Sequence, residues 1–193
     1  MAKKKGAKLD LGLILFGAAV LLGLVAFFML FAPNIDWSYK NILTNETETV
    51  HYSGLETVFG QEHTSTVGNA EVKDQIFNFS FLSFIPYLLV IIGVVFAVIA
   101  ALGKLGKLGK LGKLGDIAPI IAAVCFAISA VFFFIAVTTC SLHGYEDKAA
   151  DTIKDAKEKY DLGAGVIVAG VFSIVSALSS ATPLVLNLIS KKK

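Results

Sequence analysis

Apolar residues gather into four long runs, which are separated by shorter polar segments. The runs cover residues 11–32, 81–101, 117–139 and 162–190. Each is long enough to cross a bilayer as a helix, for which about 20 residues suffice. The pattern predicts an all-α membrane protein, in which a four-transmembrane-helix bundle forms a single domain over residues 1–193.

The first run, 11–32, follows a lysine-rich start and is closed by Pro33. A basic start also suits a cleaved signal peptide. The run is longer than a typical signal core, however, and no clear small-x-small cleavage site follows it. We therefore expect a retained transmembrane helix.

The segment 102–116 joins the second and third runs and contains four Gly-Lys-Leu triplets. Its shortness predicts an antiparallel hairpin of the two helices. Asp116 is placed to cap the third helix, with Pro119 in its first turn, where the missing N–H costs little. Pro183 predicts an interruption of the fourth helix. The triplet lysines suit a phospholipid-binding strip, but the glycines disfavour helix, so a flexible loop is the preferred interpretation.

Lysine placement predicts the orientation of the bundle. The N-terminal segment, the triplet loop and the C-terminus carry eleven lysines against two acidic residues. The stretch 33–80 carries seven acidic residues against two lysines, and 140–161 carries six against four. Because lysine-rich segments stay on the cytoplasmic side, we expect both termini in the cytoplasm and the protein in the plasma membrane.

The two outer loops differ in pattern. In the outer loop 33–80, β-prone residues fill 48–59 and 64–72, which are separated by Gly60, and the second piece contains a Val-Gly-Asn turn. We expect a small antiparallel β-sheet there. In the outer loop 140–161, apolar residues recur every three to five positions. This predicts a helix that extends the third or fourth span.

Candidate chemistry is sparse. The four runs contain no charged residue, which argues against a pump or an ion-coupled transporter. The histidines His51, His63 and His143 lie in outer loops, and Cys140 with His143 makes only a lone C-x-x-H, short of the three or four ligands of a metal site. No catalytic motif appears. We expect no enzyme activity, no metal and no cofactor.

All 17 basic residues are lysine, and the absence of arginine argues against a nucleic-acid partner. The two cysteines, Cys125 and Cys140, lie on one predicted helix at a separation of roughly 22 Å, too far for a disulfide. Cys140 is either an ordinary buried thiol or a site of pairing between chains.

Small residues recur at every fourth position in two of the runs. Such ridges let helix backbones approach closely in lipid. Packing inside one bundle and contact between protomers are both open at this point, with the first preferred. The predicted interface ridge consists of Gly165, Ala169, Ser173, Ala177 and Ala181, together with Gly93, Ala97 and Ala101.

A partial sequence motif accompanies the layout of four spans, inner termini and a larger, β-rich first outer loop. Trp37 follows the first run, and Gly54-Leu55 comes 17 residues later. These features resemble the claudin and peripheral-myelin-protein superfamily, with its W...G-L-W-x-x-C...C signature, at the distance of a bacterial relative. Glu56 stands where the second Trp would be and Phe59 where the first Cys would be.

In that family, a loop disulfide holds the sheet that makes contacts between cells, and this loop has no cysteine. The family's barrier or pore function is therefore not carried over, and the likeness is architectural. The sheet would be held by packing instead. The expected outer-sheet residues are Trp37, Tyr52, Gly54, Leu55 and Phe59.

These observations predict a non-enzymatic membrane protein with a structural, adhesion or protein-interaction role. Its expected partners are membrane lipids, and another membrane or extracellular protein or a second copy of the chain. The alternative is a small oligomeric channel or a channel or transport accessory subunit, in which several protomers line a pore.

Overall fold

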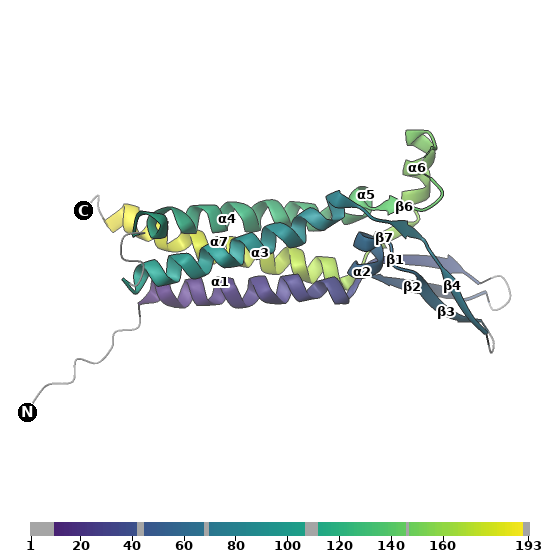
Figure 1. Ribbon diagram of the computed structural model, residues 1–193. Helices are drawn as coiled ribbons and strands as arrows, with labels where there is room; N and C mark the ends of the chain where they lie inside the picture. Colours follow the sequence, from purple (N-terminus) through teal and green to yellow (C-terminus); the bar gives the residue numbers. More distant parts are fainter. Residues whose placement is uncertain (1–9, 42–44, 68–69, 107–111, 146, 191–193) are drawn as a thin grey trace, which may run out of the picture.

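A computed structural model describes residues 10–41, 45–67, 70–106, 112–145 and 147–190 (Figure 1). Four long helices lie side by side, and a β-rich head stands at one end of them. In chain order the elements are α1 (Leu11–Phe28), η1 (Met29–Phe31), β1 (Pro33–Lys40), β2 (Thr47–Ser53), α2 (Gly54–Phe59), β3 (His63–Val67), β4 (Ala70–Asp74), β5 (Phe77–Asn78), α3 (Phe81–Lys104), α4 (Gly112–Phe134), α5 (Ala136–Thr139), β6 (Ser141–Leu142), α6 (Ala150–Lys157), β7 (Tyr160–Leu162) and α7 (Ala164–Ser190).

The helices α1, α3, α4 and α7 are long and apolar enough to cross a membrane. Their outer faces carry large apolar side chains, such as Leu21 at 67% exposure and Leu178 at 62%. Small and aromatic residues fill the interior instead. A surface of this kind is suited to lipid rather than water. The prediction of four long apolar helices with small antiparallel sheets is confirmed, and this architecture is consistent with a four-helix membrane bundle.

The bundle interior is closed by aromatic rings. Tyr87, Phe126 and Phe133 are each 1% exposed or less. Phe126 fits a notch made by two glycines: a Cβ on Gly23 would lie 2.8 Å from its ring, and one on Gly93 would lie 3.0 Å from it. The small residues therefore let α1 and α3 close around a ring from α4.

The ends of the second and third spans differ from the prediction. α3 runs to Lys104 and α4 begins at Gly112, so Asp116 is no N-cap and Pro119 lies beyond the first turn. The helices continue because extending a formed helix is cheaper than starting one, even through glycines. The middle of the triplet loop, 107–111, lies outside the described residues.

Two of the three prolines inside the long helices, Pro119 and Pro183, line one groove of about 220 Å³ at the bundle end away from the head. Pro119 leaves the Gly115 carbonyl without its helical partner, and Gly115 also lines this groove. The expected interruption at Pro183 is wrong, because α7 continues through it. A freed carbonyl is tolerated where it meets a polar opening or packed neighbours.

The outer ends of the last two spans also differ. α4 ends at Phe134 and the short α5 follows, while α7 begins at Ala164, since Leu162 belongs to strand β7. The second outer loop does contain a helix, α6. It is a separate element that extends neither span, so that part of the prediction is wrong.

The main sheet has the order β2-β1-β7, so its third strand comes from the second outer loop. Both pairings of β1 are antiparallel, and Ile35 lies opposite Tyr52 on one side and Leu162 on the other. The strands β3 and β4 form a hairpin whose turn, 68–69, lies outside the described residues, and β5 pairs with β6. Two of the three sheets therefore pair a strand from the first outer loop with a strand from, or at the end of, the second.

Candidate functional site

The outer head is formed by the described residues of 33–80 and 140–162, and its sheet has two unlike faces. The inward face of β1 carries Ile35, 1% exposed, and Trp37, which packs on the same cluster. Tyr52 lies in this cluster, and burial raises the pKa of its hydroxyl to about 12. Packing of aromatic and aliphatic side chains therefore holds the sheet.

Cys140 belongs to the same cluster and is 2% exposed. Its thiol donates to the Val137 carbonyl at 3.0 Å. Burial raises the pKa of this thiol to about 11, which keeps it protonated at neutral pH. Both cysteines are free and buried, so Cys140 has the properties of an ordinary core thiol.

The outward face of the sheet carries a polar row that crosses all three strands. His51, Asp36 and Asp161 lie directly opposite one another on β2, β1 and β7. His51 Nδ1 lies 2.8 Å from an Asp36 carboxylate oxygen. Asp161 is exposed on the other side of Asp36. Two like charges directly opposite each other destabilise a sheet, so the Asp36–Asp161 pair does not add to its stability.

Next to the row, the face stays polar and exposed. The Ser38 and Thr49 hydroxyls hydrogen-bond across β1 and β2 at 2.9 Å. Both residues are exposed. The outward face of β1 and its neighbours is therefore a hydrophilic surface.

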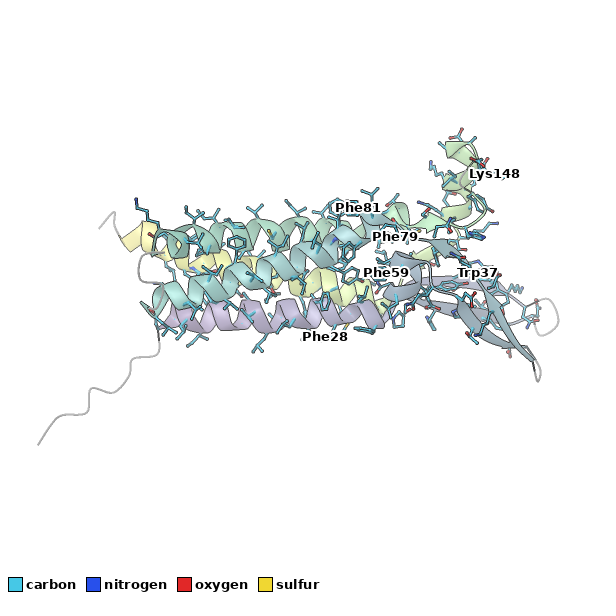
Figure 2. The ribbon with its side chains drawn as sticks, viewed as in Figure 1. Phe28, Trp37, Phe59, Phe79, Phe81 and Lys148 are labelled. Carbon is cyan, nitrogen blue, oxygen red and sulfur yellow. The ribbon has the colours of Figure 1, made fainter. Side chains whose placement is uncertain are left out.

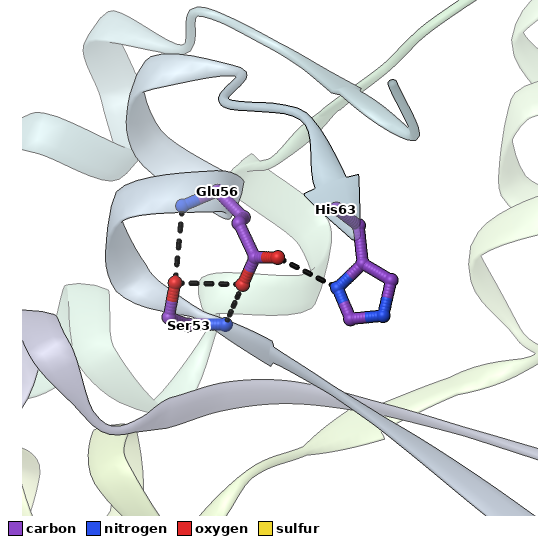
Figure 3. Close-up of polar contacts among 3 residues, drawn as sticks. All are labelled: Ser53, Glu56 and His63. Carbon is purple, nitrogen blue, oxygen red and sulfur yellow. Dashed lines mark hydrogen bonds and ion pairs between the residues drawn. The ribbon is translucent and has the colours of Figure 1, made fainter. Parts of the chain in front are cut away.

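Helix α2 follows β2 and is fixed by the capping box of Ser53 and Glu56 (Figure 3). The Glu56 carboxylate accepts from the Ser53 N–H at 2.6 Å and from its hydroxyl at 2.7 Å, and the Glu56 N–H donates to the Ser53 oxygen at 3.3 Å. Its second carboxylate oxygen lies 2.7 Å from His63 Nδ1 at the start of β3. One side chain thus joins β2, α2 and β3.

Glu56→Ala is expected to lower the free energy of unfolding by about 1 kcal/mol, because the carboxylate half of the capping box is lost. Glu56→Gln keeps a residue that completes a capping box and removes only the charge that faces His63, so its effect should be smaller. Thermal unfolding of both purified variants in one detergent measures the difference. Equal losses would contradict this assignment.

The head is joined to the bundle at Asn34, which is 1% exposed. With its amide oxygen toward Tyr87 of α3, Asn34 accepts from the Tyr87 hydroxyl, while its nitrogen donates to the Met29 carbonyl at 3.1 Å and the Ala32 carbonyl at 3.3 Å. The Asn34 backbone carbonyl accepts from the Gly163 N–H at 2.9 Å. This anchor links the start of β1 to α3 and to the segment before α7.

Three glycines allow the close approach at this anchor. A Cβ on Gly163 or on Gly165 would lie 2.6 Å from the Pro33 carbonyl oxygen, and one on Gly54 would lie 2.6 Å from the Leu30 carbonyl oxygen. Side chains at these positions would meet backbone, which cannot rotate away. The anchor therefore depends on backbone contacts that only glycine permits.

Of the expected outer-sheet residues, Trp37 and Tyr52 lie on β1 and β2 and share one cluster. Gly54, Leu55 and Phe59 lie on α2 rather than on a strand, because the capping box starts a helix there. Leu55 packs toward the bundle core, and the Phe59 ring stacks on Phe79. Figure 2 shows Phe59, Phe79 and Phe81 at the head end of the bundle.

The ridge residues of α7 face the inside of the chain over most of their length. Gly165, Ala169 and Ser173 are buried, while Ala177 and Ala181 are partly buried. On α3, Gly93 and Ala97 are buried and Ala101 is partly buried. This location favours packing within one bundle over contact between protomers.

Buried serines accompany this ridge. The Ser176 hydroxyl donates to the Ala19 carbonyl at 3.2 Å, and the Ser129 hydroxyl donates to the Pro86 carbonyl at 2.9 Å. Such bonds connect α7 to α1 and α4 to α3. The hydroxyl oxygens of Ser173 and Ser180 are buried and have no hydrogen-bond partner among the described atoms.

Within the described residues, no three His, Cys, Asp or Glu side chains converge as metal ligands would. His51 and His63 each face a single carboxylate. Cys140 and His143 flank β6, and the His143 ring bonds instead with the Asn78 side chain at 2.9 Å. The lone C-x-x-H is accounted for by contacts within the head.

Sequence reasoning missed the anchor and the polar row. The alternation of Ile35, Trp37 and Tyr39 with Asp36 and Ser38 is the signal that predicts a two-faced strand. Nothing in the pattern pairs Asp36 with Asp161, because that pairing depends on a strand from the other loop. Comparison of the chain with protein-family models, with curated proteins and with solved structures gives no match.

Proposed function

We propose that this chain is a non-enzymatic membrane protein with a structural or adhesive role, whose outer head binds a basic region of another membrane or extracellular protein. The carrying observation is the row of His51, Asp36 and Asp161 on the outward face of the sheet. A surface that keeps two opposed carboxylates at a cost in stability is typical of binding rather than packing.

The chemistry of the row favours a cationic partner. A Lys or Arg side chain placed between Asp36 and Asp161 would relieve their repulsion and form charge-assisted hydrogen bonds. The outer segments carry 13 acidic residues against six lysines. Two heads facing each other would therefore repel, and a basic protein is preferred over a second copy as the partner across a gap.

The resemblance to the claudin and peripheral-myelin-protein superfamily supports the architecture that this proposal requires, not the role itself. The head is a small sheet on a four-helix bundle, held by the Tyr52 cluster and the Asn34 anchor in place of a loop disulfide. Lysine placement supports cytoplasmic termini and a head on the outer side of the plasma membrane.

A photo-crosslinking benzophenone amino acid at Thr49, on the polar face, tests the proposal in native membranes. We expect a protein adduct whose crosslinked peptide is rich in Lys or Arg, and we expect its loss in an Asp36→Asn, Asp161→Asn variant, because the charges that hold the partner are gone. The same label at exposed Gln61, outside the sheet, is the matched control.

The double variant should be as stable as the parent or more stable, since it loses an unfavourable carboxylate pair. Thermal unfolding therefore distinguishes lost binding from lost folding. An adduct at Thr49 that persists in the double variant, or one that forms equally at Gln61, would contradict the proposal.

The alternative is a small channel or a channel or transport accessory subunit made of several protomers. Such a pore would be lined by outer helix faces, whose described residues are mainly large apolar side chains such as Leu21, Val131 and Leu178. A lining of this kind suits a hydrophobic gate more than ion selectivity. Conductance of the protein in planar bilayers tests this alternative.

A further inference from the structure

The helix α6 is only eight residues long and has no buried residue, so little packing within the chain holds it. It projects sideways from the head, past the α4 side of the bundle, and runs across the direction of the bundle helices (Figure 1). Isolated helices shorter than about 12 residues are marginal in water. If the bundle axis is taken as the membrane normal, α6 runs parallel to the membrane plane.

Two grooves separate α6 from the end of the bundle. One has a volume of about 460 Å³ and the other about 430 Å³. Lys157 lies between them and donates to the Thr138 carbonyl at 2.7 Å and the Cys140 carbonyl at 2.5 Å. Thr138, Ile153 and Lys157 line both grooves. The Lys157 hydrogen bonds therefore attach α6 to the end of the bundle, and a groove lies open on either side of them.

The groove of about 430 Å³ continues the apolar surface of the bundle. Phe79, Phe81 and Leu82 form part of its lining and are 56%, 59% and 52% exposed. Figure 2 shows Phe79 and Phe81 at the head end of the bundle, beside the base of the head. Exposed apolar side chains at the start of α3 and just before it thus reach the groove beneath α6.

The charges of α6 are divided between its sides. Ala150, Ile153, Lys154 and Lys157 line the grooves, at the spacing of one helix face. Asp151 and Asp155 each follow a groove-lining residue and are rotated by about 100° from it around the helix axis. They line neither groove. One carboxylate, that of Glu158 just after the helix, also lines the larger groove. The groove side therefore combines apolar side chains with lysines.

We propose that α6 is an interfacial helix that lies on the leaflet next to the head, with phospholipid filling both grooves. The glycerol and first methylene groups contact Phe81, Leu82 and Ile153, and the phosphate accepts hydrogen bonds from Lys154 and the free N–H of Lys157. Amphipathic helices bind membranes in this way, through apolar burial and attraction to anionic headgroups. The lipid contact is separate from the polar sheet face of the proposed function.

Nitroxide labels on Ala150→Cys, on the groove side, and Asp155→Cys, on the opposite side, test the inference in phosphatidylcholine vesicles. Collision rates with oxygen, which enters the bilayer, are compared with those of a water-soluble nickel chelate. We expect oxygen to exceed nickel at position 150 and the reverse at position 155. Parent protein treated with the same nitroxide reagent is the control for the native cysteines, which are buried and should not react.

Nickel access that exceeds oxygen access at both positions would overturn the inference. A second copy of the chain in the grooves would also overturn it, and would appear as spin–spin broadening that disappears on dilution with unlabelled protein. With phosphatidylglycerol in the vesicles, Lys154→Gln should retain anionic lipid about fivefold more weakly, as measured by native mass spectrometry. Exposed Lys148, which lines neither groove, is the matched control, and an equal change in Lys148→Gln would contradict the phosphate contact.

Discussion

Gly165→Ala is expected to lower the free energy of unfolding by roughly 2 to 3 kcal/mol and to loosen the head from the bundle. The new Cβ would lie 2.6 Å from the Pro33 carbonyl oxygen and 3.0 Å from the Ala32 side chain. Both belong to the chain segment that carries Asn34. Because the clash is with backbone, α7 and the start of β1 must move apart.

The matched control is Gly17→Ala on α1, where a Cβ meets nothing within 4 Å. Alanine favours helix over glycine by up to about 1 kcal/mol, so this variant should be neutral or more stable. Thermal unfolding in one detergent compares the two, and hydrogen exchange of β1 and β7 reports on the head. Unchanged stability and exchange in Gly165→Ala would contradict the anchor.

Phe126→Ala is expected to cost roughly 3 kcal/mol, at the low end of the range for core phenylalanines. The ring is 0% exposed and fills the notch between Gly23 and Gly93. Because lipid is as apolar as the bundle core, removing the ring loses less hydrophobic stabilisation than it would in water. The packing contacts of the ring are still lost, and a cavity is left. Unfolding in detergent measures the loss, with Phe28→Ala, a change at a ring that is 57% exposed, as the control that should lose little.

A double-mutant cycle makes this second test specific. Gly93→Ala places a Cβ 3.0 Å from the Phe126 ring and is destabilising on its own. Combined with Phe126→Leu, whose side chain does not reach as far, the Gly93→Ala penalty should shrink. Strict additivity of the two losses would contradict direct packing of the ring against Gly93.

The helical part of the fold could be predicted from the sequence because it depends on local composition. A run such as 81–101 is apolar throughout, and only a spanning helix satisfies its backbone groups in lipid. The ends of the runs were less predictable. Asp116 and Pro119 fit a helix start, but α4 continues past them because neighbouring helices and an open groove tolerate an interior proline.

The head could be predicted only in part, because its structure depends on contacts between the loops. Thr57, Val58 and Phe59 are β-prone, yet they form α2, since Ser53 and Glu56 cap a helix and Val58 packs into the bundle core at 1% exposure. The capping-box spacing was readable in the sequence. The pairing of β1 with β7 was not, because no short-range pattern specifies it.

The expected site residues also differ in whether their role depends on local sequence or on contacts between distant segments. Trp37 and Tyr52 belong to an alternating strand pattern and lie in the sheet core. Gly54 and Gly165 were assigned to a sheet and to a helix ridge, yet both lie at the Pro33–Asn34 anchor. Their shared role depends on how α7 meets the start of β1, which composition does not reveal.

We propose that the small-residue ridge packs inside one chain, so that a single bundle presents the head to a partner. The mass of the purified protein in lipid nanodiscs, measured by native mass spectrometry, tests this most directly. We expect the mass of one chain, because Gly165, Ala169 and Ser173 are already buried within it. A defined, ring-sized multiple of that mass would contradict it and would favour a pore built from several protomers.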